Sequence, residues 1–412
     1  MTEKLKKIIT EICRFVLGAV FIFSGTVKNI DPVGGALKFD DYLGVFHLSS
    51  LKAISLFASI NLSALEFLLG LCLLVAVYRR LTTICLLIFM SFMTLLTLYL
   101  AIYNPVHDCG CFGDAFILTN WQTFFKNIFI LLPAAIVTFL FCKKMTPLYS
   151  YRAYWFVPVF GYIFMLGFSY YNYYSLPVKD FRPYSIGSNI PQKMSIPEDA
   201  PQDEIEFIYT KDGKQKSFSM TSLAEIDSTW TFVDSKVVKE GYRPPIISFE
   251  LYDAGDNNIA DAILEEGKTV FLLVSPHLED ASDSNSDEIN NIYDYARKHG
   301  YAFYGVTASA HESIDEWGNT TGAEYPFLTT DDVMLKTLIR SNPGLVLLRS
   351  GTVIWKWHHR NLPHEETVNA EIESLLSGDT KKNNPWIWIV LCFALPLLLV
   401  WLYDFKFLRQ QT

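Results

Sequence analysis

The stretch from residue 81 to residue 114 reads LTTICLLIFMSFMTLLTLYLAIYNPVHDCGCFGD and combines two features that decide the fold. Residues 81–103 are almost entirely apolar, and a helix needs roughly 20 such residues to cross a bilayer. The following polar turn holds two cysteines separated by one glycine, in a chain with 7 Cys among 412 residues. The stretch therefore predicts a membrane span that ends in a loop with a thiol pair.

Apolar segments of similar length recur along the chain and predict a multi-pass membrane protein. The first segment follows three lysines but lacks a small-x-small cleavage site before Lys28, so we interpret it as a span and not as a signal peptide. The six predicted spans cover residues 8–27, 51–78, 81–103, 124–141, 153–171 and 386–403.

The net charge of −9 is unevenly distributed. Residues 176–385 contain 19 Lys and Arg against 34 Asp and Glu, so this segment is acidic while the rest of the chain is basic. An acidic outer segment argues against nucleic acid as a partner, because neutralising phosphates requires Lys and Arg. The expected surroundings are the lipid bilayer for the spans and water for the acidic insert.

Basic residues beside the spans predict the orientation, because they gather on the cytoplasmic side. With a cytoplasmic N-terminus, ten bases flank the spans on the inner side and four on the outer side. The inner set is Lys4, Lys6, Lys7, Arg79, Arg80, Lys143, Lys144, Arg152, Lys406 and Arg409, and the outer set is Lys28, Lys38, Lys52 and Lys126. We therefore expect an inner-membrane protein with both termini cytoplasmic, and with the Cys109 loop and residues 176–385 in the periplasm, where disulfides persist.

Cys109 and Cys111 form the first candidate site. A disulfide across one residue closes a small ring, for which Gly110 supplies the backbone freedom, and a bond with unrelaxed geometry suits exchange better than stapling. A protonated His107 beside the pair would lower a thiol pKa. Three other interpretations stay open: a static clip of the loop, half of a metal site completed by His107, or two reduced packing residues. Two further convincing ligands are missing nearby, so we predict no metal site.

Glu66 is the second candidate, because an ionisable side chain within hydrocarbon is costly and suggests a function. Facing the interior of a helical bundle, it would shuttle a proton or hold a quinone-like ligand. The alternative is a structural partner for Arg14. No motif in the sequence supports a quinone, and no cofactor is evident.

The first third of the chain resembles the DoxX/MauE membrane proteins. The resemblance rests on RFVLG at 14–18, FIFSG at 21–25, Lys28, and Asp31 with Pro32. The loop sequence CGCFG at 109–113 resembles the thiol motif of the MauE-type branch. The resemblance implies a four-helix membrane unit over residues 1–148 and a redox-associated role in the maturation of exported proteins. Residues 149–175 and 385–404 then add two further spans.

The acidic segment is predicted to contain two parts. Residues 176–262 hold a linker and a β-rich unit, with strands at 204–209 and 216–220 around an Asp-Gly turn and a further strand at 246–252. Residues 263–380 are predicted to form an α/β domain. Its predicted elements are strands at 268–276, 301–308, 344–349 and 352–358, and helices at 287–299, 331–341 and 365–376.

The order of these elements resembles the thioredoxin fold, which implies a cis peptide bond before Pro343. A working thioredoxin would carry Cys-x-x-Cys after the first strand, but residues 275–282 read SPHLEDAS, and residues 176–385 contain no cysteine. The outer domain is therefore expected to dock a partner and not to exchange thiols itself. The whole layout also resembles a Bacteroidetes-type group of DoxX-related proteins without an established reaction, through DFRPY at 180–184, GYRPP at 241–245 and RSNPGL at 340–345.

Two functional hypotheses follow, and whether the protein is an enzyme stays open between them. In the first, Cys109 and Cys111 exchange a disulfide with the thiols of exported proteins or of another envelope redox protein. In the second, the protein is a non-enzymatic membrane scaffold whose outer domain binds a protein or envelope component, and the cysteine pair is a clip.

Overall fold

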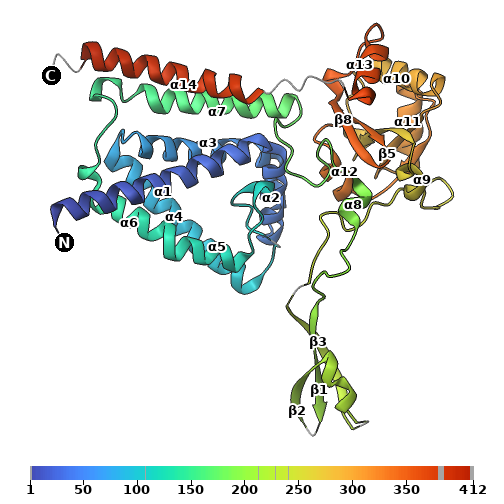
Figure 1. Cartoon of the computed structure of the whole chain (residues 1–412), viewed down its shortest axis with the longest axis horizontal. Coiled ribbons are helices and arrows are strands. Elements are labelled where there is room, and N and C mark those ends of the chain that lie inside the picture. Colours follow the sequence, from blue (N-terminus) through green and yellow to red (C-terminus); the bar gives the residue numbers. More distant parts are fainter. Residues whose placement is uncertain are drawn as a thin grey trace. The chain divides into compact units, whose positions relative to one another are not determined.

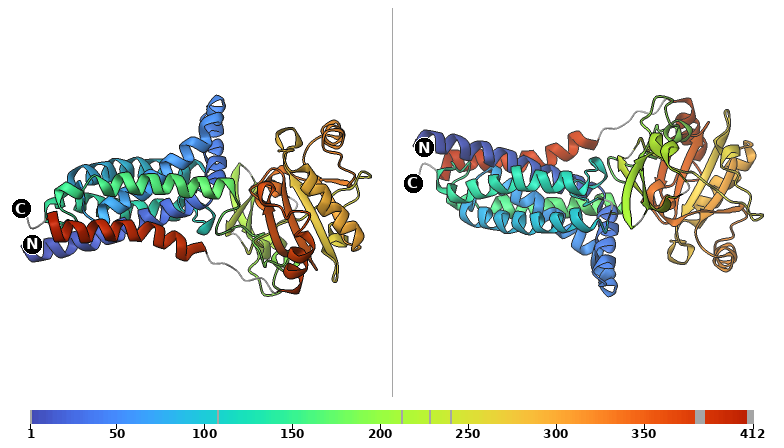
Figure 2. Two further views of the ribbon diagram at one scale, coloured as in Figure 1. Left: turned by 90° about the horizontal axis from the view of Figure 1, so that it is seen from above. Right: turned by 90° about the horizontal axis from the view of Figure 1, so that it is seen from below.

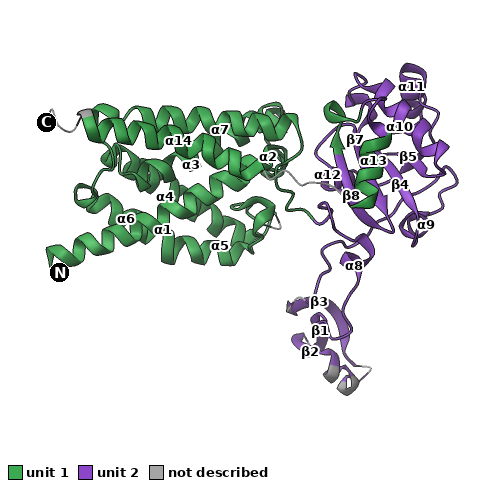
Figure 3. Cartoon of the chain, turned by 45° about the horizontal axis from the view of Figure 1, so that its top comes forward, with its two compact units in different colours: residues 1–182, 357–363, 369–412 green, residues 183–356, 364–368 purple. Residues whose placement is uncertain are grey.

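The computed structural model describes residues 2–106, 108–211, 213–227, 229–239, 241–378 and 385–408. Its internal contacts divide the chain into two compact units (Figure 3). The first unit comprises Met1–Arg182, Trp357–Pro363 and Asn369–Thr412, and the second comprises Pro183–Lys356 and His364–Val368. The long apolar helices belong to the first unit, and most of the β-structure belongs to the second.

Six helical segments of the described residues have the length and hydropathy of membrane spans, which confirms the predicted number. They are Glu3–Ile30, Ser49–Leu74, Arg79–Tyr103, Asn120–Leu140, Tyr151–Tyr174 and Pro385–Lys406. Their main helices are α1 (Glu3–Ile30), α3 (Ser55–Leu74), α4 (Arg79–Tyr103), α5 (Asn120–Lys126), α6 (Leu132–Leu140), α7 (Phe156–Tyr174) and α14 (Pro385–Tyr403). A π-helical turn at Asn127–Leu131 joins α5 and α6 into one span. The chain is a multi-pass membrane protein.

The helices of the first unit lie side by side, with a short helix branching from one end (Figure 1). The start of α1 and the end of α14 lie at the same end of the bundle. At the opposite end, α2 (Pro32–Val45) leaves the bundle direction and projects sideways in both views of Figure 2. The cysteine loop between α4 and α5 also lies at this second end.

Glycines allow α1 and α3 to pack closely. A Cβ added to Gly25 would lie 2.5 Å from the backbone nitrogen of Phe67, and one added to Gly70 would lie 2.8 Å from the carbonyl oxygen of Gly18. Small residues permit such close backbone approach between membrane helices. The contact brings the C-terminal half of α1 against the middle of α3, where Glu66 lies.

The larger sheet of the second unit contains five strands in the order β6-β5-β4-β7-β8. Strand β4 pairs in parallel with β5, which pairs in parallel with β6, while β4 and β7 are antiparallel. The strands are β4 (Thr269–Ser275), β5 (Ala302–Thr307), β6 (Phe327–Thr329), β7 (Gly344–Arg349) and β8 (Thr352–His358). The helices of this region are α9 (Ala260–Leu264), α10 (Ser286–Lys298), α11 (His311–Thr321), α12 (Asp332–Leu338) and α13 (Val368–Ser377).

This sheet has the strand order and directions of a thioredoxin-like fold. The predicted neighbouring parallel strands are β4 and β5, and the peptide bond between Asn342 and Pro343 is cis, so both predictions are confirmed. Residues 271–274 of β4 and 345–348 of β7 are buried, as expected for central strands covered on both faces. Helix α11 and strand β6 were not predicted, and β6 extends the sheet beyond β5.

The smaller sheet contains three antiparallel strands in the order β2-β1-β3. Strands β1 (Glu204–Lys211) and β2 (Lys214–Ser219) form the predicted hairpin, and β3 (Thr231–Lys239) pairs with the other edge of β1. A short helix, α8 (Ile190–Met194), precedes this sheet.

The strand predicted at 246–252 is wrong. Within this fully described segment only Tyr252 makes bridges, to Asn258 and Thr329, and these are isolated. The Asp253 carboxylate accepts backbone N–H bonds from Gly255 and Asn257, so the chain turns back at this point instead of extending.

Candidate functional site

The loop between α4 and α5 holds Cys109 and Cys111 as an unbridged pair with their Sγ atoms 2.7 Å apart. Gly110 has a φ of +63°, a conformation that glycine adopts without steric cost. The loop is closed at its base by Asn120, whose amide donates to the side chain of Asn104 and to the carbonyl of Val106. The turn therefore holds both sulfurs on one side of a short closed loop.

Helix α2 fixes the loop from one side. The Lys38 ammonium forms an ion pair with Asp108 at 2.8 Å, and the Tyr42 hydroxyl donates to the carbonyl of Cys109 at 2.8 Å. The second carboxylate oxygen of Asp108 accepts the N–H of Gly110. Because Lys38 and Tyr42 are four residues apart, both side chains lie on one face of the helix.

The two thiols are electrostatically unequal. The hydrogen bond from Cys111 lowers the pKa of Cys109 to about 6 despite its burial, and the Thr123 hydroxyl and the Lys126 ammonium act in the same direction. The same hydrogen bond, together with burial, raises the pKa of Cys111 well above its ordinary value. Cys109 is therefore the thiolate of the pair at neutral pH, and Cys111 keeps its proton.

Glu66 is buried in α3 and connects to the loop through α1. Lys28 binds both carboxylate oxygens, at 2.8 and 3.0 Å, and the Ser24 hydroxyl lies 2.7 Å from the second oxygen. The same hydroxyl lies 2.7 Å from the carbonyl oxygen of Cys111. The structure therefore brings together Glu66 and the cysteine pair, which are 43 and 45 positions apart in the sequence.

The alternative of a structural pair between Glu66 and Arg14 is wrong. The Arg14 guanidinium donates to the carbonyls of Leu73 and Leu74 and forms an ion pair with Glu11, one turn earlier on α1. Arg14 thus donates hydrogen bonds to carbonyl groups at the end of α3, whereas Glu66 lies two turns earlier on that helix and binds Lys28.

His107, predicted to activate a thiol, lies outside the described residues. Among the residues that the structure does describe, no three His, Cys, Asp or Glu side chains come together as a metal site would require. The lowered pKa of Cys109 has its causes in Cys111, Thr123 and Lys126.

Four residues of the site were not predicted from the sequence: Ser24, Lys38, Tyr42 and Thr123. Lys38 and Tyr42 carried a usable signal, because a base and a tyrosine at helical spacing follow the end of a predicted span. Ser24 lies within the FIFSG motif, but its partners are distant in the sequence. Thr123 is a plain helical residue whose proximity to Cys109, 3.6 Å from hydroxyl to sulfur, only the fold reveals.

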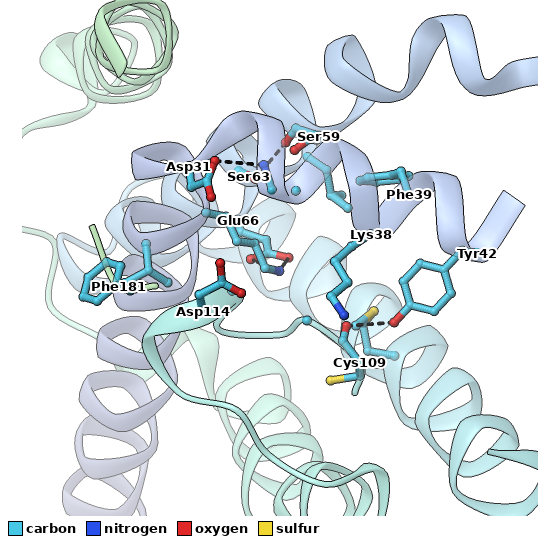
Figure 4. A pocket seen from close by; sticks show the side chains of 18 of the residues that line it. Asp31, Lys38, Phe39, Tyr42, Ser59, Ser63, Glu66, Cys109, Asp114 and Phe181 are labelled. Carbon is cyan, nitrogen blue, oxygen red and sulfur yellow. Dashed lines mark hydrogen bonds and ion pairs between the residues drawn. The ribbon is translucent and has the colours of Figure 1, made fainter. Parts of the chain in front are cut away.

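A cavity of about 550 Å³ lies beside the cysteine loop (Figure 4). Its walls come from α1, α2, α3, α4, the loop and the segment 177–182 that follows α7. Most of its lining surface is apolar, and charged side chains are set into that surface. Lys38, Tyr42, Glu66 and Cys109 face it from three different elements. The predicted thiol site and the predicted intramembrane carboxylate thus border one space.

The thioredoxin-like domain has a hydrogen-bonded polar loop where a thioredoxin would carry its cysteines. The Ser275 hydroxyl donates to the side-chain oxygen of Asn342, whose amide donates to the carbonyl of His277. The Glu279 carboxylate accepts hydrogen bonds from Ser309 and Ser313. These residues offer no nucleophilic thiol.

Comparison with known proteins agrees with the membrane architecture. Residues 6–140 match the family model of methylamine utilisation protein MauE, and residues 203–240 match a domain of unknown function (DUF8463). Among curated proteins, none matches the chain at a significant level.

Two solved structures are similar to part of the chain. One is a solution structure of a candidate protein disulfide isomerase from Bacteroides thetaiotaomicron, at 16% identity and a TM-score of 0.26, covering 31% of this chain and 86% of that one. The other is the crystal structure of a cysteine-to-serine mutant of PrxQ from Xylella fastidiosa, at 15% identity and a TM-score of 0.23, covering 31% and 89%. The thioredoxin-like assignment therefore rests on the strand order and directions described above.

Proposed function

We propose that this MauE-type membrane protein, which carries a thioredoxin-like outer domain, exchanges a Cys109–Cys111 disulfide with the thiols of exported proteins or of another envelope redox protein. The observation that carries the proposal is the pair itself: two sulfurs 2.7 Å apart, one with a lowered and one with a raised pKa. A static clip needs no such asymmetry, whereas exchange benefits from one good leaving group.

The exchange transfers two electrons from a partner dithiol to the loop. A partner thiolate attacks Cys111, a bond forms between the partner sulfur and Cys111, and Cys109 leaves as a thiolate. The second partner thiol then attacks the mixed disulfide, which releases an oxidised partner and leaves Cys111 reduced. The sum converts a loop disulfide and a partner dithiol into a loop dithiol and a partner disulfide.

Leaving-group quality assigns the two roles. A thiol with a lower pKa leaves faster, which favours Cys109 as the leaving sulfur. Cys109 is buried and Cys111 is partly buried, so access does not override this assignment. Cys111 is therefore the sulfur that carries the partner.

The outer domain contributes docking in this proposal. Residues 176–385 contain no cysteine, so this region has no thiol of its own to pass to the loop. Its role is to hold a partner protein near the membrane surface. The proposed location is the inner membrane, with the loop and the outer domain on the periplasmic side, and it is supported by the excess of bases on the opposite side.

Trapping a mixed disulfide tests the proposal. In the Cys109→Ser variant Cys111 can attack the disulfide of an oxidised partner, which forms a mixed disulfide and releases one partner thiol, and no second loop thiol can then displace the partner. A covalent adduct should therefore accumulate in cells and disappear on reduction. The Cys111→Ser variant should trap less, because the proposed exchange attaches the partner to Cys111. The double Ser variant is the control and should give no adduct.

The clip and scaffold alternatives give different results. A clip predicts no adduct and equal loss of stability from either single replacement. If the double Ser variant supports the same level of folded, disulfide-bonded exported proteins as the wild type, the thiols are incidental and the scaffold hypothesis replaces this one.

A further inference from the structure

The proposed exchange requires an electron acceptor that the loop itself does not contain. Each turnover ends with Cys109 and Cys111 reduced, so a two-electron acceptor must restore their disulfide. The five other cysteines of the chain lie in or beside the spans, and the outer segment has none. The acceptor must therefore be a separate molecule that reaches the loop sulfurs.

The cavity beside the loop has the size and position for such an acceptor. Its volume of about 550 Å³ falls within the range of small-molecule sites, roughly 300–1,000 Å³. Cys109 and Gly110 form part of its wall, so a molecule inside it lies next to the cysteine loop. Phe39, Leu43 and Leu62 supply apolar surface.

The cavity borders the exposed apolar surface of a membrane span. Phe92 and Leu95 line it and are 62% and 69% exposed, and both belong to the membrane-spanning helix α4. Exposed apolar side chains on a span contact acyl chains and not water. A ligand that enters past them must partition into the bilayer.

The wall of the cavity carries hydrogen-bond donors. Lys28 and Lys38 line it, and each ammonium has three N–H groups. The ion pairs of Lys28 with Glu66 and of Lys38 with Asp108 do not use all of these N–H groups. Tyr42 lies next to them with its hydroxyl on the Cys109 carbonyl. Donors set in a mostly apolar surface suit a ring with carbonyl oxygens on an apolar tail.

We infer that this cavity binds a lipid-soluble quinone, which reoxidises the loop dithiol. This inference rests on the proposed thiol exchange and identifies its electron acceptor. In the reaction the two thiols lose two electrons and two protons and form one S–S bond, and the quinone takes up both electrons and both protons to become a quinol. No further reactant is required.

The test uses the purified full-length protein in detergent, reduced with a thiol reagent and freed of that reagent. Decylubiquinone is added, and its reduction is followed by ultraviolet absorbance while free thiols are counted. The wild type should reduce one quinone for each pair of thiols lost. The Cys109→Ser and Cys111→Ser double variant should reduce none.

Matched variants of α3 test whether quinone reduction depends on the cavity. Leu62 lines the cavity, whereas Leu65, one turn on, is exposed and is not among the lining residues. Leu62→Trp should slow quinone reduction by roughly tenfold or more, the factor that about 1.4 kcal/mol of lost binding produces, while Leu65→Trp should leave the rate unchanged. Leu43→Trp, which fills the same cavity from α2, provides a second blocking variant should Leu62→Trp fail to fold.

Separate measurements distinguish a failure of the quinone site from a failure of the proposed thiol exchange. Oxidised protein is mixed with a reduced dithiol peptide without quinone, and formation of the peptide disulfide is measured. Peptide oxidation without any quinone reduction would overturn the quinone site and leave the exchange proposal intact. Quinone reduction without peptide oxidation would remove the exchange proposal. Equal rates in the wild type and all folded Trp variants would show that quinone reaches the thiols by another route, and the cavity assignment would fall.

Discussion

At the scale of single residues, the unequal thiols determine how the loop reacts. With its pKa at about 6, Cys109 is mostly thiolate at neutral pH, and only the thiolate is nucleophilic. We predict that alkylation of Cys109 by iodoacetamide rises through a midpoint near that pH, while Cys111 stays unreactive at neutral pH. Mass spectrometry of peptides from protein alkylated over a pH series gives both rates separately.

A Cys111→Ala variant provides the control for this prediction. It removes the hydrogen bond that most lowers the pKa of Cys109, so the alkylation midpoint should move upward toward the ordinary thiol value of 9.0. An unchanged midpoint in this variant would mean that another group, such as His107 or Lys126, activates Cys109.

The buried pair of Lys28 and Glu66 supports a second prediction at this scale. Glu66 is 3% exposed and Lys28 is 15% exposed, so removal of one partner strands a buried charge. Lys28→Met should lower the free energy of unfolding by about 3 kcal/mol, measured by detergent-induced denaturation of the purified protein. Lys28→Met combined with Glu66→Leu should recover most of that loss.

The exposed Lys52→Met is the matched control and should have little effect. If the single and double variants at Lys28 and Glu66 lose equal stability, the two side chains are not energetically coupled.

Sequence alone identified the site residues that are rare in this chain or energetically costly inside a membrane span. Cys109 and Cys111 stand out because the chain has few cysteines, and Glu66 stands out because a carboxylate in a span is expensive. Ser24, Lys38 and Tyr42 are ordinary types at ordinary places. Their roles depend on α1, α2 and the loop meeting in space, which no local pattern encodes.

At the scale of elements, the glycine contact between α1 and α3 positions Glu66 against Ser24 and Lys28. Replacing Gly25 by Val puts a side chain against the backbone of α3, where an added Cβ already lies 2.5 Å from Phe67 nitrogen. We predict that Gly25→Val sharply reduces the yield of folded protein, measured as monodisperse material after detergent extraction. Gly70→Val should act in the same direction.

Gly167→Val on α7 is the control, because nothing in the described part of the chain lies within 4 Å of a Cβ added there. Normal yield from Gly25→Val would mean that the helices can separate without loss of the fold.

Long elements were predictable, and short ones were not. The membrane spans and the buried strands β4 and β7 have continuous apolar runs, which are stable only away from water, in the bilayer or in the protein interior. Strand β6 is three residues long and forms only because β5 presents a free edge to it. The segment 246–252 has the composition of a strand, but the turn at Asp253 leaves it without a continuous partner.

At the scale of the whole molecule, the distribution of charge predicts which parts share a compartment. We predict that a membrane-impermeant maleimide labels a Ser284→Cys variant in intact spheroplasts and labels a Thr2→Cys variant only after membrane disruption. Both positions are exposed, and both variants carry Ser at 109 and 111 so that the loop does not contribute. The physical reason is the excess of bases beside the ends of the spans at the N-terminal side.

Labelling of the Thr2→Cys variant in intact spheroplasts would contradict the orientation. Equal labelling at both positions would instead place the N-terminus and the outer domain on the same side of the membrane. That result would require an even number of crossings before the domain, where the described spans give an odd number.

The hydrogen bond from Cys111 to Cys109 also has a thermodynamic consequence. A thiolate with a pKa of about 6 stabilises the reduced loop at neutral pH by roughly tenfold over an ordinary thiol pair, because most of it is ionised. A tenfold change in a two-electron equilibrium corresponds to about 30 mV. The midpoint potential of the loop is therefore shifted to a more positive value, and its couple draws electrons from ordinary dithiols as a stronger oxidant than an unperturbed pair would be.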